Sequence, residues 1–436
     1  MTSTIIMFLA VTVVLLFLYA MLFIKEASNK SYLKFIFLSF PFLGIDLLPS
    51  VLSTTLFVFL TFVFFFFFYT RTPTKSQGGN SYFPVFLLLI ASIGLGLFLS
   101  TDLSKDSITD SIQLFAVFFF AKVLIDELYL DADFRNSVLH CMKATLIFSF
   151  VFLIFQFVFG PSFSFAKSQN INVAGGLTVR YPSYFQDPQK YAQYLSASSF
   201  LMLLLPGKAK GKSSQLGLVL CGLSMIALLF TGGRAALGGW LIGLMIIVVL
   251  GNAQYRAAIL SISVVVALFI YNYADVIPIF KRADLSEAYE FRYAIWQDAY
   301  AIFLDHPFFG IGLGNYANYV AVHNPDQYWI SDNEVTPFDH PESGYLKLLT
   351  EFGLIGFTIV MFLLLKPIYV GLKTYFKTKD LSLVALASSI FTWLVGFYTV
   401  YSFGDIRIKI LIVSIICMLI ATSKKNDHIN NTTPIV

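Results

Sequence analysis

Two arginines stand where an isolated positive charge is costly, and both therefore suggest contact with an anion. The first is Arg234, in the phrase Thr231-Gly-Gly-Arg-Ala between two apolar stretches. An ionisable residue in this position is a functional candidate by default, although an arginine can also extend its head group to the membrane interface. The small residues around Arg234 instead favour close helix packing about the guanidinium.

The second arginine, Arg292, lies in a segment with helical periodicity that runs from about 284 to 303. Asp284 and Glu287 have the spacing of a capping box at its start. A helix here places Arg292 on an apolar face with Trp296. That arginine needs an anion, which is either a nearby carboxylate in a structural ion pair or a ligand, and the spacing leaves both alternatives open.

The phrase Asp339-His-Pro-Glu-Ser-Gly-Tyr345 supplies a titratable group. Pro341 suits the first position of a helix, so the sequence predicts His340 at a helix start, where the helix dipole favours neutral imidazole. A neutral histidine can accept a proton near neutral pH. The alternative is a capping histidine without a catalytic role. Glu342, two residues on, is a candidate for substrate contact.

Planar polar and aromatic side chains of the kind that carbohydrate sites use gather between 180 and 191. An ordinary loop would contain the same residue types, so both interpretations stay open. The candidates for substrate binding here are Arg180, Tyr184, Gln186 and Asp187.

The phrase Asp305-His-Pro-Phe-Phe-Gly-Ile-Gly-Leu-Gly-Asn315 contains three alternating glycines. Pro307 is expected to end the preceding helix, and the glycines to form a flexible turn whose amides could line an anion. It is not a dinucleotide fingerprint, because it follows a helix and its spacing differs. No Asp-x-Asp metal motif occurs in an outer loop, and the 3 cysteines lack metal-ligand spacing. We therefore expect no metal and no other cofactor.

These segments are embedded in a membrane chain. Of its 436 residues, 57% are hydrophobic and 12% charged, whereas soluble domains carry roughly 25% charged residues. At about 20 apolar residues per span, the sequence predicts a single all-α membrane domain over 1–436 with about 12–13 transmembrane helices. A net charge of +4, widely dispersed, argues against a nucleic-acid partner.

The basic residues Lys208, Lys210 and Lys212 place their loop in the cytoplasm. Alternating from there, the long connections at about 161–189 and 272–347 lie outside, as does the short turn with Arg234. Connections of this length are usually functional or disordered. Arg407 and Lys409 are exceptions to the charge rule, since they enter the last span from the outer side.

Taken together, these segments resemble the O-antigen polymerase and ligase family (the Wzy/WaaL group). The likeness lies in their order: an arginine in a short outer turn, then Arg292-x-x-x-Trp with the glycine phrase in the large loop, then His340 and a helix ending in Glu-Phe-Gly-Leu-Ile-Gly356. The phrase Phe185-Gln-Asp-Pro-Gln189 also resembles a family phrase that usually ends in Asp-Pro-Asn, from which Gln189 departs.

The resemblance implies a GT-C-type bundle in the bacterial inner membrane, with its active site facing the periplasm. It implies transfer of a glycan from undecaprenyl diphosphate to an acceptor hydroxyl, with Arg234 and Arg292 on the diphosphate and His340 as the base. Arg180 would be a further contact. Guanidinium forks bind phosphate oxygens bidentately, so two of them could replace a metal.

Three activities follow as alternatives. A polymerase, which we prefer, adds the chain to another lipid-linked repeat unit, whereas a ligase adds it to the lipid A core. A lipid-linked sugar flippase is an alternative from another class. The implied partners are an undecaprenyl-diphosphate-linked oligosaccharide, membrane lipids and a chain-length regulator protein.

Overall fold

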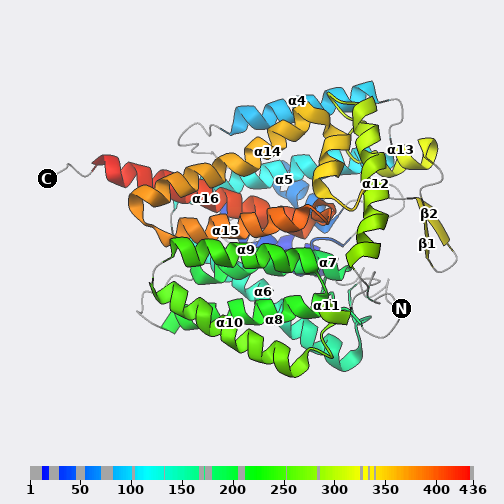
Figure 1. Ribbon diagram of the computed structural model, residues 1–436. Helices are drawn as coiled ribbons and strands as arrows, with labels where there is room; N and C mark the ends of the chain where they lie inside the picture. The colour runs from blue at the N-terminus through cyan, green and yellow to red at the C-terminus, as the bar shows by residue number, and fades with distance from the viewer. Residues whose placement is uncertain are drawn as a thin grey trace.

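The computed structural model is a bundle of α-helices with a small β-hairpin at one end (Figure 1). It describes residues 12–18, 29–45, 55–69, 82–100, 104–131, 133–165, 171, 179–204, 212–251, 253–281, 285–324, 328–331, 334–337 and 340–432. The capping residue predicted at 284 lies outside these ranges.

Long apolar stretches account for the first part of the bundle, up to the large loop. Two 3₁₀ turns, η1 (Phe40–Phe42) and η3 (Phe200–Leu204), follow α2 and α7. The helices are α2 (Asn29–Leu38), α3 (Leu56–Phe67), α4 (Phe83–Leu99), α5 (Lys105–Leu130), α6 (Phe134–Phe159), α7 (Pro188–Ser199), α8 (Lys212–Thr231), α9 (Arg234–Leu250) and α10 (Ala253–Tyr273).

The large loop carries short elements and one long helix, and the last apolar helices follow it. Strand β1 pairs antiparallel with β2, with Tyr328 opposite Pro337 and Ser331 opposite Glu334. The elements are α11 (Pro278–Lys281), α12 (Leu285–Asp305), α13 (Tyr316–His323), β1 (Tyr328–Ser331), β2 (Glu334–Pro337), α14 (Gly344–Thr378), α15 (Leu381–Phe397), η4 (Ser402–Gly404) and α16 (Ile406–Thr432).

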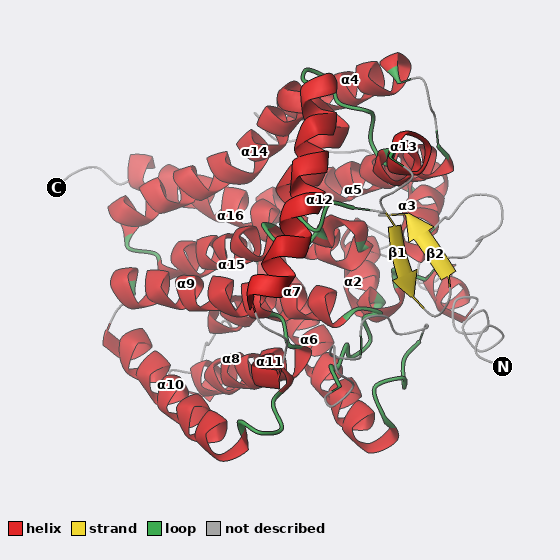
Figure 2. Ribbon diagram, turned by 45° about the vertical axis from the view of Figure 1, so that its right-hand side comes forward, coloured by secondary structure: helices red, strands yellow, loops and turns green. Residues whose placement is uncertain are grey.

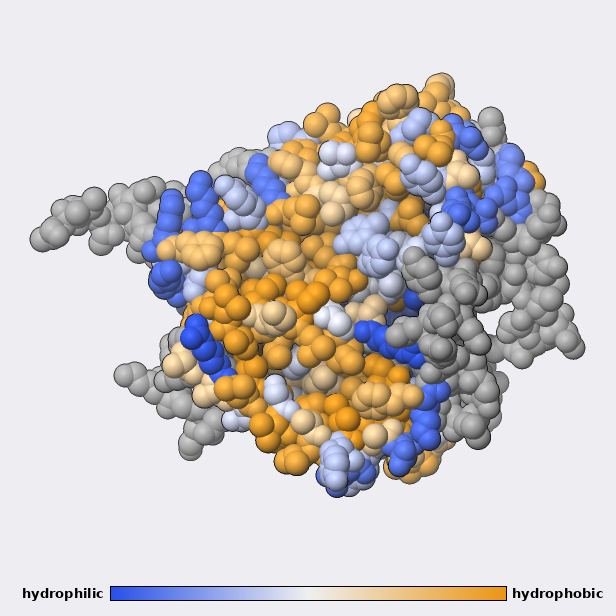
Figure 3. Space-filling model, viewed as in Figure 1, coloured by the Kyte–Doolittle hydropathy of each residue, from blue (hydrophilic) through white to orange (hydrophobic). Residues whose placement is uncertain are grey.

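The apolar helices form a membrane-embedded body. Among the described residues, α5, α6, α14 and the 406–424 part of α16 are long and apolar enough to cross a membrane, and six shorter apolar helices accompany them. Large apolar side chains are exposed on the outside of the bundle, for example Phe98 at 84% and Val158 at 68%. Figure 3 shows this hydrophobic surface flanked by hydrophilic residues at both helix ends. The predicted class, an all-α polytopic membrane protein, is confirmed.

The bundle has two halves that meet where α9 packs on α15. Small residues permit this contact, because a Cβ at Gly239 would lie 2.3 Å from the Thr392 carbonyl oxygen. Helices α4, α5, α14 and α16 lie in one half, and α7, α8 and α10 lie in the other (Figures 1 and 2). Helix α12 runs across the ends of both halves. The large loop is therefore placed over one mouth of the bundle.

Candidate functional site

The centre of the candidate site is Glu342, which joins two of the predicted residues. Its Oε2 accepts a hydrogen bond from the Arg292 guanidinium at 3.3 Å, and its Oε1 lies 3.4 Å from His340 Nε2. The three side chains are 18%, 23% and 29% exposed, so they are accessible without being fully solvated. The carboxylate alternative for Arg292 is thus what this structure shows, and its partner is a residue that also touches the histidine.

His340 does not stand at the first turn of a helix, which corrects the prediction. Helix α14 begins at Gly344, and Ser343 is its N-cap, accepting from the Leu346 amide. Glu342 takes a positive φ of 49° in the turn before it. Residue 344 is a glycine that packs on α15, because a Cβ there would lie 2.3 Å from the Phe397 ring. His340 thus precedes the first residue of α14, and its ring contacts the Glu342 carboxylate.

Arg180 reaches the same environment from the loop before α7. Its Nε donates to the Thr231 carbonyl at 2.7 Å, and the side chain is 4% exposed. Burial lowers the pKa of Arg180, while the carboxylates of Asp187 and Glu342 act in the opposite direction and Arg292 lowers the pKa further. The loop before α7 therefore brings Arg180 close enough to Glu342 and Arg292 for their charges to act on it.

Arg234 is the first residue of α9, directly after the turn that Arg180 contacts. Gly232 in that turn has a φ of +68°, and a Cβ there would lie 3.2 Å from Arg180 Nε. Gly233 packs against Ala192 of α7, because a Cβ at residue 233 would lie 2.5 Å from the Ala192 Cβ. The small residues of this phrase thus pack against the Arg180 side chain and hold the half-buried Arg234 at the start of its helix.

The glycine phrase closes a break in α14. The Ile311 and Gly312 amides donate to the carbonyls of Thr350 and Glu351 in α14. In return, the Leu354 amide donates to Pro307 at 2.8 Å, across the break at Gly353. The backbone groups released by the break are therefore satisfied by this loop. Of the three glycine amides, those of Gly310 and Gly312 donate to backbone carbonyls, and that of Gly314 donates to the Glu351 carboxylate.

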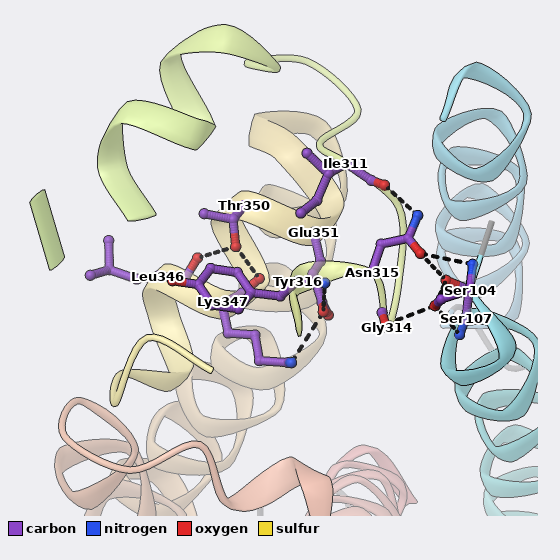
Figure 4. Close-up of polar contacts among 10 residues, drawn as sticks. All are labelled: Ser104, Ser107, Ile311, Gly314, Asn315, Tyr316, Leu346, Lys347, Thr350 and Glu351. Carbon is purple, nitrogen blue, oxygen red and sulfur yellow. Dashed lines mark hydrogen bonds and ion pairs between the residues drawn. The ribbon is translucent and has the colours of Figure 1, made fainter. Parts of the chain in front are cut away.

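A buried ion pair below the loop was not predicted. Lys347 Nζ lies 3.2 Å from Glu351 Oε1, and that carboxylate oxygen also accepts from the Tyr316 amide (Figure 4). Asn315 ties the loop to the start of α5, since its Oδ1 accepts from the Ser107 hydroxyl at 2.6 Å. The i,i+4 spacing of Lys347 and Glu351 was the signal available in the sequence. Its meaning depended on knowing that this face of α14 is buried.

The loop residues before α7 separate into different roles. Tyr184 is 1% exposed, and its ring stacks on Phe185. The predicted substrate contact of Tyr184 is wrong, because its side chain is packed in the core. Its backbone carbonyl accepts a hydrogen bond from Arg407. Asp187 caps α7 by accepting from the Gln189 amide at 2.6 Å. Gln186 is half-buried beside it.

Arg407, an exception to the charge rule, is neutralised by its surroundings. Asp405 accepts from its Nε at 2.9 Å and its Nη2 at 2.6 Å, and the Tyr184 carbonyl accepts from Nη1 at 3.0 Å. Burial opposes ionisation of Asp405, but Arg407 outweighs it and holds the pKa of that carboxyl below its usual value. Lys409 similarly donates to Gln113 at 2.8 Å. These cations therefore belong to packed polar networks at the N-terminal end of the last helix.

No group of three histidine, cysteine, aspartate or glutamate side chains within the described ranges is arranged to hold a metal ion. The site instead offers guanidinium groups for an anion and an imidazole paired with a carboxylate for proton transfer. Fold and site together define a polytopic α-helical membrane protein with a cationic, titratable site at one mouth of its bundle.

Comparison with known families agrees with this class. Residues 218–361 match the Wzy_C family, described as O-antigen ligase. The match contains Arg234, Arg292, His340 and Glu342, and it confirms the resemblance inferred from the sequence; Arg180 lies outside it. It supports a role in glycan transfer during O-antigen assembly. No curated protein matches the chain.

Proposed function

We propose that the protein transfers a glycan from undecaprenyl diphosphate to an acceptor hydroxyl on the periplasmic side of the bacterial inner membrane, polymerising lipid-linked repeat units. The observation that carries this proposal is the contact of one carboxylate, Glu342, with both a guanidinium and an imidazole. A leaving diphosphate needs cations, and an attacking hydroxyl needs a base. Both requirements are met within one small cluster.

The arginines serve the leaving group. A diphosphate competes with Glu342 for Arg292, and it carries more negative charge than the carboxylate. The ion pair is long and partly exposed, and such pairs contribute only about 0–1 kcal/mol, so the exchange costs little. Arg234 and the buried Arg180 add positive potential from the neighbouring turn. Developing charge on the departing oxygen is stabilised most by donors that are already in place.

Glu342 and His340 serve the nucleophile. The carboxylate favours the tautomer with a proton on Nε2, so Nδ1 is the basic nitrogen. That nitrogen takes the proton of the acceptor hydroxyl as the oxygen attacks the sugar C1. The bond from C1 to the diphosphate oxygen breaks, and its electron pair leaves with the diphosphate. The reaction is a single displacement that inverts C1, and the histidine later releases its proton to water.

Two alternatives differ in acceptor or in class. A ligase would use the same site and deliver the glycan to the lipid A core. A flippase requires polar groups along a path through the membrane, whereas Arg180, Arg292, Glu342 and His340 gather at one mouth. The clustering therefore favours an enzyme, of GT-C type and within a single membrane domain. A chain-length regulator is the protein partner that polymerisation would call for.

The decisive experiment supplies the purified protein with a defined undecaprenyl-diphosphate repeat unit, with and without lipid A core. We expect a ladder of polymers from the repeat unit alone. A single product that forms only when the core is present would assign the protein as a ligase. Absence of any glycan transfer under both conditions, with transport of the lipid across vesicles, would overturn the enzymatic proposal.

A further inference from the structure

A cavity of about 300 Å³ lies at the end of α12 that is remote from the candidate site. Its walls come from the end of α4, the glycine phrase and α13. We call it the distal pocket. Ligand pockets in proteins measure about 300–1,000 Å³, so the distal pocket is large enough for one small ligand group, such as a single sugar ring.

Helix α12 joins the distal pocket to the candidate site. Arg292 lies within this helix, and His306 follows its last residue, Asp305. At a rise of 1.5 Å per residue, Arg292 and His306 are about 20 Å apart along the helix axis. Because α12 runs across the ends of both halves of the bundle (Figure 2), the two sites lie over the same mouth.

Asn315 fixes one wall of the distal pocket. Its Nδ2 donates to the Ser100 hydroxyl and to the Ile311 carbonyl, both at 2.9 Å. Its Oδ1 accepts from Ser107 (Figure 4), and the side chain is 2% exposed. The Ser100 oxygen therefore accepts from a fixed amide, and within the described chain its own O–H has no acceptor, so it is available to a ligand.

Two histidines flank Tyr319 in the lining of the distal pocket. The His323 ring stacks on the Tyr319 ring with centres 4.2 Å apart, and the His306 ring meets it edge-on at 5.7 Å. His323 Nδ1 lies 3.2 Å from the Tyr319 carbonyl, which can only accept, so that nitrogen carries a proton. His306 Nε2 lies 3.5 Å from the Tyr319 hydroxyl. The second ring nitrogen of each histidine has no partner among the described residues, so both can bond to a ligand.

This lining selects an uncharged ligand that is rich in hydroxyl groups. Among the described residues that line the distal pocket there is no arginine, lysine, aspartate or glutamate. A phosphate or an ammonium group would therefore lack the ionic partner that a charged group needs when it leaves water. The imidazoles and the Ser100 hydroxyl instead lie beside the apolar surfaces of Pro307 and Phe308. A sugar ring matches this combination, because its hydroxyls point outward and its C–H groups form an apolar face.

We propose that the distal pocket binds an uncharged sugar residue of the glycan chain, several units away from the carbon that reacts. This inference rests on the proposed glycan transfer and adds a second point of contact for the same chain. A glycan that is held at one point binds the second point intramolecularly, which raises the overall affinity without a new contact at the reaction centre. The protein should therefore prefer a donor whose glycan is long enough to reach both points.

The kinetic test removes both imidazoles and compares lipid-linked donors of one and of several repeat units. His306 and His323 are exposed, so a His306→Ala/His323→Ala double variant should fold. His140→Ala is the matched control, because this exposed histidine of α6 also contacts a carbonyl four residues earlier, that of Asn136, and lies outside the distal pocket. We expect the double variant to lower the ratio of kcat/KM for the long donor to that for the short donor at least about tenfold, and the control to keep the wild-type ratio. An unchanged ratio in the double variant would overturn the inference, as would the absence of any preference for the long donor in the wild-type protein.

A footprinting measurement separates this inference from the reaction. Purified protein is treated with diethyl pyrocarbonate, which modifies accessible imidazoles, with and without a lipid-free oligosaccharide of the repeat unit, and mass spectrometry locates the modified residues. We expect the oligosaccharide to slow the modification of His306 and His323 and to leave His140 unaffected. Such protection in a protein that shows no glycan transfer would keep the distal pocket and remove the proposed function. Equal modification with and without the oligosaccharide, or protection by glycerol phosphate in its place, would overturn the assignment of the distal pocket.

Discussion

Replacing Arg292 or Arg234 with lysine keeps the charge and removes the guanidinium fork. Arg292 contacts Glu342 at 3.3 Å, and both side chains are about a fifth exposed. A pair of this kind contributes about 0–1 kcal/mol to stability. Lysine at position 292 should therefore leave folding and membrane insertion intact, so any loss of turnover reports on the chemistry.

The expected loss is large because a diphosphate is recognised by geometry as well as charge. A guanidinium meets two oxygens at once, whereas an ammonium is a compact point charge on a flexible stem. Removing one preorganised donor from a poorly hydrated site costs about 2.7–4 kcal/mol of transition-state stabilisation. This corresponds to a roughly 100- to 1,000-fold loss of kcat for each variant.

The assay is polymer formation from a defined lipid-linked repeat unit by purified protein, normalised to correctly folded protein. Arg256→Lys is the matched control, because that guanidinium is exposed and, among the described residues, donates to the backbone carbonyls of Val248 and Val249. It should keep wild-type turnover. Near-normal activity of both Arg292→Lys and Arg234→Lys would refute the diphosphate assignment and make these residues structural.

Four further outcomes are expected. His340→Ala should lower turnover roughly 10²- to 10⁴-fold by removing the general base, and wild-type product from this variant would reject the base assignment. Turnover should survive EDTA; inactivation that Mg²⁺ or Mn²⁺ reverses would contradict leaving-group stabilisation by arginines. A cysteine at Asn324 should react with an impermeant maleimide on intact spheroplasts and one at Lys210 should not, the reverse pattern inverting the topology. Gly353→Ala should destabilise the protein by about 1–3 kcal/mol, because φ is +62° and the new Cβ would lie 2.4 Å from Phe308 backbone; an unchanged melting temperature would show that the break is relaxed.

The helices were largely predictable, because hydrophobic runs and their turn residues are local properties. The segment predicted to be helical from about 284 to 303 is α12, Leu285–Asp305. The start of α14 was not predictable. Pro341 suited a first helical residue, but α14 begins at Gly344, with Ser343 as its N-cap and the Phe397 ring of α15 packed against Gly344.

The candidate site was predictable by residue type and less so by role. Arg234 and Arg292 were singled out because a charge beside apolar residues is costly, His340 because of its expected place at a helix start, and Arg180 because planar polar and aromatic residues surround it in the sequence. Glu342 contacts both Arg292 and His340. This arrangement could be known only from the positions of the three side chains in space. The partners of the glycine amides were not predictable either, because the carbonyls and the carboxylate that accept from Gly310, Gly312 and Gly314 lie partly on α14, which is remote in the sequence.

The sequence by itself determined that this chain is an all-α polytopic membrane protein, because the hydropathy of each segment is a local property of its residues. Only the tertiary structure decided which charges are available. Arg407 is occupied by Asp405 and Tyr184 is packed in the core, whereas Arg292 and His340 share a carboxylate that a ligand can reach. Partner choice depends on distances between segments remote in the chain, and residue spacing along the sequence does not contain those distances.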